Sequence, residues 1–145
     1  MSRLTRAQVL ANSNNNRRVE YFSDFNTNFS LTPVGEQLAR ATNEKSIIQA
    51  LRNLIFTRPG ERLFNPNFGC YLKDLLFEHN LPEVITIGEK YVRDAIEAYE
   101  PRVELLDVSL SSSETNVHEA YITIRFRTIN NEEPNTVTFP LKRVR

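Results

Sequence analysis

The spacing of hydrophobic residues changes from a helical period to strict alternation along this chain. From position 43 to 57, apolar residues recur three or four positions apart, which predicts an amphipathic helix. Asn43 is the predicted N-cap of this helix. Pro59 disfavours helical backbone at the residue before it, so we expect the helix to end near Thr57.

Two more helical stripes follow. Residues 72–77 carry a short apolar stripe, and residues 82–99 carry a longer one that begins with a proline at the first turn. Pro101 should end the second of these helices. The helices are therefore predicted to precede every long strand.

After Pro101 the apolar residues alternate with polar ones, which predicts strands with one buried face. We expect the turns to lie at 111–113 and 130–134, where serine, asparagine and proline gather. Short turns favour an antiparallel meander, and the chain is predicted to be α+β, with two to three helices packed on a C-terminal sheet of three or four strands. The residues expected to share the buried face are Leu106, Val108, Leu110, Ile122, Ile124, Phe126, Val137, Phe139 and Leu141.

The last predicted strand contains Pro140, which has no N–H to donate and is therefore expected at an exposed sheet edge. Such an edge is normally blunted, and Lys142, Arg143 and Arg145 could do this. An edge is also a template to which another chain can add a strand. The residues alone favour blunting.

The segment between the first two helices is dense in turn-forming and charged residues. Pro59-Gly60 predicts one turn and Asn65-Pro66 a second. We expect Phe64 and Phe68 to point inward. The simplest role for the charged side chains is to brace the loop by bonding to its free carbonyl groups, and the residues concerned are Arg58, Pro59, Gly60, Glu61 and Arg62.

The N-terminal part divides into two segments. Residues 1–20 are polar and rich in asparagine and arginine, so we expect a flexible arm. Residues 21–31 carry Phe22, Phe25 and Phe29 and predict an extended segment that lies against the core. The predicted organisation is this arm followed by a single domain, 21–145.

Composition limits the function classes. Lysine plus arginine equals aspartate plus glutamate, at 18 each, so no net field favours nucleic acid or an anionic membrane. No apolar run approaches the roughly 18 residues of a membrane helix and no leader is recognisable, so we expect cytoplasmic synthesis. Cys70 is the sole cysteine and is expected to be a small packed residue.

The sequence offers no catalytic, cofactor or metal constellation, so we expect a protein that is not an enzyme. His79 and His118 are the only histidines and lie in different elements. The four glycines form no phosphate-binding cluster. A glycosidase needs a pair of carboxyl groups across a cleft, and no pair stands out among Asp24, Glu36, Glu61, Asp74, Glu78 and Glu100.

Three strings carry a family resemblance: the phrase 21–25 (YFSDF), the loop string 58–62 (RPGER) with the Asn-Pro and Phe-Gly pairs after it, and the triplet 100–102 (EPR). Together they resemble the small baseplate wedge protein of contractile-tailed phages, a "lysozyme-like" family shared with the small baseplate subunit of type VI secretion systems. The resemblance covers roughly residues 21 to 129. The N-terminal arm carries none of it.

This resemblance implies a structural component of a virion tail that links the wedge core to the first sheath ring. It implies that Glu100, Pro101 and Arg102 contact the larger wedge subunits, whereas the triplet alone would be read as a helix end with solvated charges. It also implies that sheath strands add to the last strand, where the relevant residues are Val137, Phe139, Leu141 and Arg143. Tail tube or hub subunits are further implied neighbours.

Three alternatives remain open at this stage. One is a peptidoglycan hydrolase, as the family's older label suggests. The second is the small baseplate subunit of a type VI secretion system, although the loop match and the asparagine-rich arm favour a phage. The third is a cytoplasmic regulator that binds one protein partner.

Overall fold

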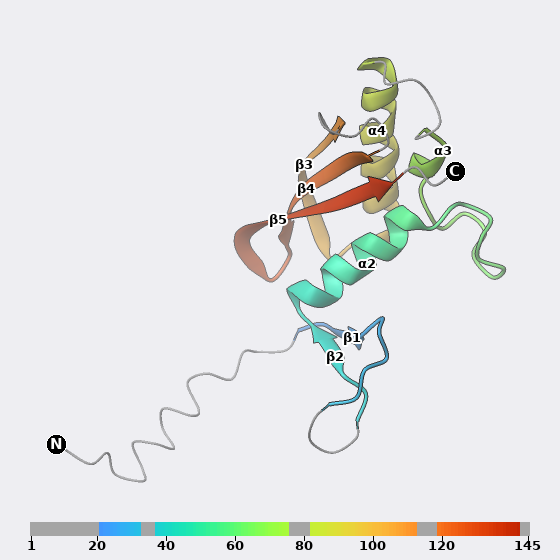
Figure 1. Cartoon of the computed structure of the whole chain (residues 1–145). Coiled ribbons are helices and arrows are strands. Elements are labelled where there is room, and N and C mark those ends of the chain that lie inside the picture. Colours follow the sequence, from blue (N-terminus) through green and yellow to red (C-terminus); the bar gives the residue numbers. More distant parts are fainter. Residues whose placement is uncertain (1–20, 33–36, 76–81, 113–118, 143–145) are drawn as a thin grey trace, which may run out of the picture.

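Helices precede the long strands, as the period change predicts (Figure 1). The structure is a computed structural model that describes residues 21–32, 37–75, 82–112 and 119–142. The elements after the N-terminal segment are helices α2 (Glu44–Phe56), α3 (Leu72–Leu75) and α4 (Pro82–Tyr99), then strands β3 (Val103–Ser112), β4 (Glu119–Thr128) and β5 (Asn131–Lys142). A small sheet of β1 (Ser23–Phe25) and β2 (Arg40–Thr42) comes before them. The predicted α+β class is confirmed.

Strands β3, β4 and β5 form an antiparallel meander in that order within the described residues. Thr123 pairs with Thr138, and their hydroxyl oxygens lie 3.1 Å apart, which ties the β4–β5 register through side chains as well as backbone. Helix α4 packs against β3, while α2 runs close to β5 in Figure 1. The chain thus leaves the two outer strands of the sheet in different surroundings.

The core lies between the helices and one face of the sheet. Each element contributes the residues of its apolar stripe: Ile47, Leu51 and Ile55 from α2, Val92 and Ile96 from α4, and Ile122, Ile124 and Phe126 from β4 are buried almost completely. Burying a side chain of this size contributes about 1.5–3 kcal/mol. Cys70 is buried in the same cluster, where a small residue is expected.

The predicted face of β3 is wrong at its start. Leu105 pairs with Phe126 but Asp107 pairs with Arg125, so Leu106 is a bulge residue without a partner in the ladder. The extra residue reverses the alternation, and Leu106 is 40% exposed.

The turn between β4 and β5 is also shorter than predicted. It consists of Ile129 and Asn130, and β5 already begins at Asn131. Arg127 pairs with Pro134 but Thr128 pairs with Asn131, so the register shifts between these two pairs. The other polar residues of the predicted turn therefore belong to the irregular start of β5. At the other predicted turn, 111 and 112 belong to β3 and 113 lies outside the described residues.

The N-terminal aromatic segment was predicted to lie against the core, and only part of it does. Phe22 packs against the core cluster, but Phe25 and Phe29 are 59% and 70% exposed. These residues belong to or follow β1, which pairs with β2 beyond the start of α2 and is too short to cover the main sheet (Figure 1). The prediction therefore holds for Phe22 among these three residues.

Asn43 stands at the N-cap of α2 but makes no side-chain capping bond. Its φ of 50° is a left-handed value that asparagine tolerates well. Its side-chain oxygen accepts hydrogen bonds from the backbone N–H groups of Tyr21 (2.9 Å) and Phe22 (3.3 Å). Asn43 therefore ties the segment before β1 to the start of α2.

Several predictions fall on residues that the structure does not describe. These are the arm at 1–20, the end of the short helix at Leu76 and Phe77, both histidines, and Arg143 and Arg145.

Candidate functional site

The α2–α3 loop, residues 57–71, is held by its own backbone. The Gly60 N–H donates to the Pro66 carbonyl at 2.7 Å, which joins the two predicted turns. The Cys70 N–H donates to the Thr57 carbonyl at 2.9 Å and closes the base of the loop against α2. Both predicted turns are present.

Charged side chains add contacts inside the α2–α3 loop. The Glu61 carboxylate accepts a hydrogen bond from the Arg58 backbone N–H at 3.0 Å, and the Arg58 guanidinium pairs with Asp74. Arg62 lies 4.0 Å from the centre of the Phe68 ring, a cation–π distance. Among the described residues the partners of the two arginines are thus a carboxylate and a ring, where loop carbonyls were expected. The bracing role itself stays a prediction.

Gly69 lies where the loop closes against Thr57 and has no room for a side chain, and the sequence alone did not single it out. Its φ is +131°, and a Cβ atom built on it would lie 2.4 Å from the Thr57 carbonyl oxygen. The Phe-Gly pair in the loop string was the available signal. Phe68 beside it is partly buried, packs edge-on against Tyr99 at 5.3 Å between ring centres, and is inward-facing as predicted.

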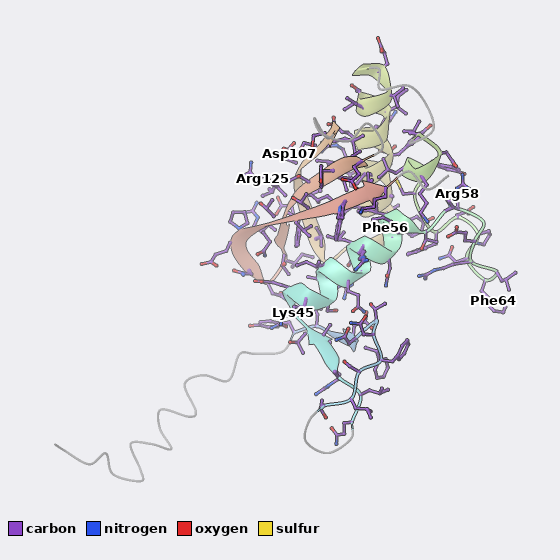
Figure 2. The ribbon with its side chains drawn as sticks, in the orientation of Figure 1. Lys45, Phe56, Arg58, Phe64, Asp107 and Arg125 are labelled. Carbon is purple, nitrogen blue, oxygen red and sulfur yellow. The ribbon has the colours of Figure 1, made fainter. Side chains whose placement is uncertain are left out.

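The tip of the loop is apolar and solvent-exposed. Leu63 is 91% exposed and Phe64 is fully exposed, and Figure 2 shows Phe64 at the outer end of the loop. The inward position predicted for Phe64 is therefore wrong. The turns on either side direct the chain away from the core at this point, so hydrophobicity alone could not indicate the direction of the side chain.

The triplet at the end of α4 forms a closed ion pair. Arg102 donates from Nε to Glu100 Oε1 at 2.6 Å and from Nη2 to Oε2 at 2.7 Å, which is the two-bond fork that arginine makes with a carboxylate. Glu100 is buried, with 6% exposure, and the Arg102 side chain is 29% exposed. The reading of these residues as ordinary solvated charges is therefore wrong.

Pro101 creates this arrangement by ending α4 so that both charged neighbours turn to the same side. The Arg102 guanidinium also lies 5.5 Å from the centre of the Phe22 ring. Its hydrogen bonds to Glu100 raise the pKa of Arg102 further above its ordinary value, so the guanidinium stays charged. The structure thus brings two of the resemblance strings together, the aromatic phrase and the triplet.

The third predicted site, on β5, is an edge of the sheet whose apolar side chains face inward. Phe139 and Leu141 are buried, and Val137 packs against the core. Phe139 meets the Phe56 ring of α2 edge-on at 6.2 Å. Figure 2 shows Phe56 on the side of α2 towards the sheet. What β5 offers to the outside is therefore backbone and the polar side chains between these residues.

At the opposite edge of the sheet, α4 packs against β3 and occupies one of its backbone donors. Glu89 of α4 accepts a hydrogen bond from the Leu110 backbone N–H of β3 at 3.0 Å. A strand N–H that bonds to a carboxylate in this way is unavailable to a further strand. On the outer side of β5, by contrast, the described residues place no neighbouring strand.

One groove and several carboxylates bear on the hydrolase alternative. A groove of about 560 Å³ lies between the α2–α3 loop and α4, and Asp94 is the single carboxylate among its described lining residues. Of the carboxylates weighed from the sequence, Glu61, Asp74 and Glu100 each contact an arginine side chain or backbone group. Glu36 and Glu78 lie outside the described residues.

Comparison with known proteins decides the family. Residues 41–133 match the family described as baseplate wedge protein gp25. The chain belongs to the gp25 baseplate wedge family. The gp25 protein of Enterobacteria phage T4 is 35% identical over 101 residues, covering 68% of this chain and 74% of that protein. The chain is accordingly a structural component of the baseplate wedge of a contractile tail.

Solved structures share the fold. A Geobacter sulfurreducens protein described as a candidate tail lysozyme superposes with a TM-score of 0.63 and 29% identity over 68% of this chain and 89% of that one. A chain of the anti-feeding prophage baseplate gives 0.59 at 18% identity, covering 82% and 83%. A chain of the type VI secretion baseplate complex gives 0.57 at 14% identity, covering 67% and 90%. In the described part of the gp25-family chain, no helix combines the length and apolarity needed to span a membrane.

Proposed function

We propose that this gp25-family protein joins the wedge core of a phage tail baseplate to the first ring of tail sheath, and that sheath strands add to the β5 edge. The observation that carries this proposal is the difference between the two sheet edges. Helix α4 covers β3 and occupies the Leu110 N–H, whereas β5 pairs with β4 alone within the described residues. Strand addition needs an unoccupied row of backbone groups.

The wedge contact is proposed at the triplet. Because Glu100 is buried beneath Arg102, the group that can reach a partner is the guanidinium, and Glu100 positions it. Arginine keeps N–H donors beyond the two that bond to Glu100, and these could bind a carboxylate or carbonyl of a larger wedge subunit. Arg102→Lys should weaken capture of the purified wedge subunits while retaining the charge. Equal capture by both proteins would contradict the contact.

A phage virion is the favoured setting. The 35% identity to the T4 wedge protein supports it more than the 14% identity to a chain of the type VI secretion baseplate. Tube or hub subunits remain further candidate neighbours. The protein would be made in the host cytoplasm and act without a cofactor, nucleic acid or membrane.

We further propose that the protein has no hydrolase activity, despite its likeness to a candidate tail lysozyme. Retaining and inverting glycosidases both use two carboxyl groups about the scissile bond. The groove beside α4 supplies Asp94 alone among its described residues. Clearing of a peptidoglycan suspension by the purified chain, lost in Asp94→Asn, would overturn this proposal.

Binding to the cognate tail sheath protein tests the edge assignment. The test variant is Thr136→Lys with Thr138→Lys, which places two charges on the exposed face of β5, a common way to blunt an edge. The matched control is Ser109→Lys with Ser111→Lys, the same change on the exposed face of β3. We expect the β5 variant to lose binding and the β3 variant to retain it. Equal behaviour of the two, or no binding by the unaltered chain, would overturn the proposal.

A further inference from the structure

Two prolines stand in register on β5. Pro134 pairs with Arg127 and Pro140 with Tyr121, in one uninterrupted register. In an antiparallel ladder each residue directs its N–H and C=O to the same side, and successive residues alternate sides. A proline has no N–H to donate. A ladder that includes both proline positions must therefore be hydrogen-bonded through the residues that alternate with them, which point their backbone groups to the other side.

The β4–β5 ladder is therefore made by the odd-numbered residues of β5, which include Val137, Phe139 and Leu141. The even-numbered residues direct their backbone groups away from β4. At Pro134 and Pro140 the outer side offers a carbonyl but no donor. At Thr136 and Thr138 it offers both.

The outer edge is consequently a short hydrogen-bonding segment with a defective position at each end. A strand seated across Thr136 and Thr138 finds two donors and two acceptors. If that strand slips by two residues, one of its carbonyl groups faces the ring of Pro134 or Pro140 and receives no hydrogen bond. Leaving such a group unpaired on binding lowers affinity by about tenfold or more.

The side chains of β5 define the kind of strand that fits. Thr136 and Thr138 are exposed on one face of the sheet. Val137 and Phe139 lie on the other, where Phe139 meets Phe56 of α2. Because neighbouring strands place like faces together, an added strand would set polar residues beside the threonines and apolar residues beside Val137 and Phe139.

We propose that Pro134 and Pro140 fix the register of strand addition, confining an alternating polar and apolar strand of the sheath protein to Thr136 and Thr138. This inference rests on the proposed function, since it assumes the sheath protein as partner. It adds that the edge is selective for one register, which a plain exposed edge would not be.

Amide hydrogen exchange on the full chain, with and without the cognate sheath protein, tests the register directly. In the free chain the N–H groups of Thr136 and Thr138 should exchange fast, while those of Val137 and Phe139 are protected by the ladder. Bound sheath protein should slow exchange at Thr136 and Thr138 at least about tenfold. Sheath binding without that slowing, or with slowing centred on Lys142, overturns the proposal.

A pair of variants separates backbone from side-chain effects. Thr136→Pro removes an outward donor without removing a β4–β5 hydrogen bond, and should weaken sheath binding by about tenfold. Thr136→Val changes the side chain alone and should bind as the unaltered chain does. If Thr136→Pro does not fold, Thr138→Pro with Thr138→Val repeats the comparison, and the exchange experiment stands independently.

The outcomes distinguish this proposal from the one beneath it. Binding by the unaltered chain that survives both proline substitutions overturns the fixed register but leaves the sheath-joining role intact. Absence of sheath binding by the unaltered chain overturns both.

Discussion

Replacing Gly69 with alanine tests how the α2–α3 loop closes on α2. The new Cβ would lie 2.4 Å from the Thr57 carbonyl oxygen, 2.9 Å from the Arg58 carbonyl carbon and 3.0 Å from the Pro59 nitrogen. All three are backbone atoms, so no side-chain rotation can relieve the overlap. The φ of +131° adds strain of about 1–3 kcal/mol for a residue with a Cβ.

Relief of the overlap requires Thr57 and Gly69 to separate. That movement weakens the Cys70 N–H bond to the Thr57 carbonyl, which contributes about 0.5–1.5 kcal/mol. It also shifts Cys70, which is 2% exposed, out of its place in the core cluster. We expect a total loss of about 3 kcal/mol in the free energy of unfolding.

Gly60→Ala is the matched control. Gly60 also has a positive φ, +93°, but a Cβ there would meet nothing within 4 Å. It should cost about 1–2 kcal/mol from conformational strain alone. Urea unfolding of both variants gives their free energies of unfolding, which can be compared if the slope of the free energy with urea concentration is unchanged. Equal losses in the two variants would refute the steric argument at Gly69.

Three further measurements examine the rest of the molecule. Arg102→Ala leaves the buried Glu100 carboxylate unpaired and should lower the free energy of unfolding by about 3 kcal/mol. Adding Glu100→Gln should restore part of this, and a purely additive double variant would argue against coupling. Burial, with a smaller effect of a nearby carboxylate, raises the pKa of the Cys70 thiol above its ordinary 9.0. The stability that this pKa shift contributes is therefore complete below pH 9 and is lost as the pH rises through the folded-state pKa. Iodoacetamide at pH 8 should therefore modify Cys70 at a rate limited by opening of the fold, and modification as fast as in urea would contradict this. Phe139→Ala should cost about 3–5 kcal/mol by urea unfolding, whereas Phe64→Ala, at a fully exposed tip, should change it by less than about 0.5 kcal/mol; a large loss in the second would mean that the tip packs in solution.

The long elements were predictable because their residues repeat a period. The stripe that contains Ile47 and Leu51 indicates α2, and the alternation that contains Ile122 and Ile124 indicates β4, since packing needs that spacing and no other. Two positions predicted from proline also agree with the structure: α4 ends just before Pro101, and Pro140 lies on an outer strand. These features are local, and local sequence is sufficient for them.

Features that depend on how the chain turns or on how strands pair were missed. The bulge at Leu106 depends on the register with β4, which no property of β3 alone expresses. The outward direction of Phe64 is set by turns on both sides of it. The burial of Glu100 follows from Arg102 folding back over it at the end of α4.

The candidate sites were likewise predictable in part. The strings that carry the resemblance indicated where to look, and the structure adds that Phe22 and Arg102 are in contact. It also distinguishes the two sheet edges through Glu89, a residue that no motif or spacing in the chain indicated. A helix residue that bonds to a strand residue 21 positions away can be found only once the fold brings them together.

The bond between Glu89 and the Leu110 N–H has a consequence for the symmetry of any assembly built on this sheet. With the Leu110 N–H of β3 occupied and no strand beside β5 among the described residues, the proposed strand addition would be confined to the β5 side. Such a sheet has a polarity, and a row of subunits that starts from it has a defined first member. The covered edge would then set the origin of the row, while the open edge sets its direction of growth.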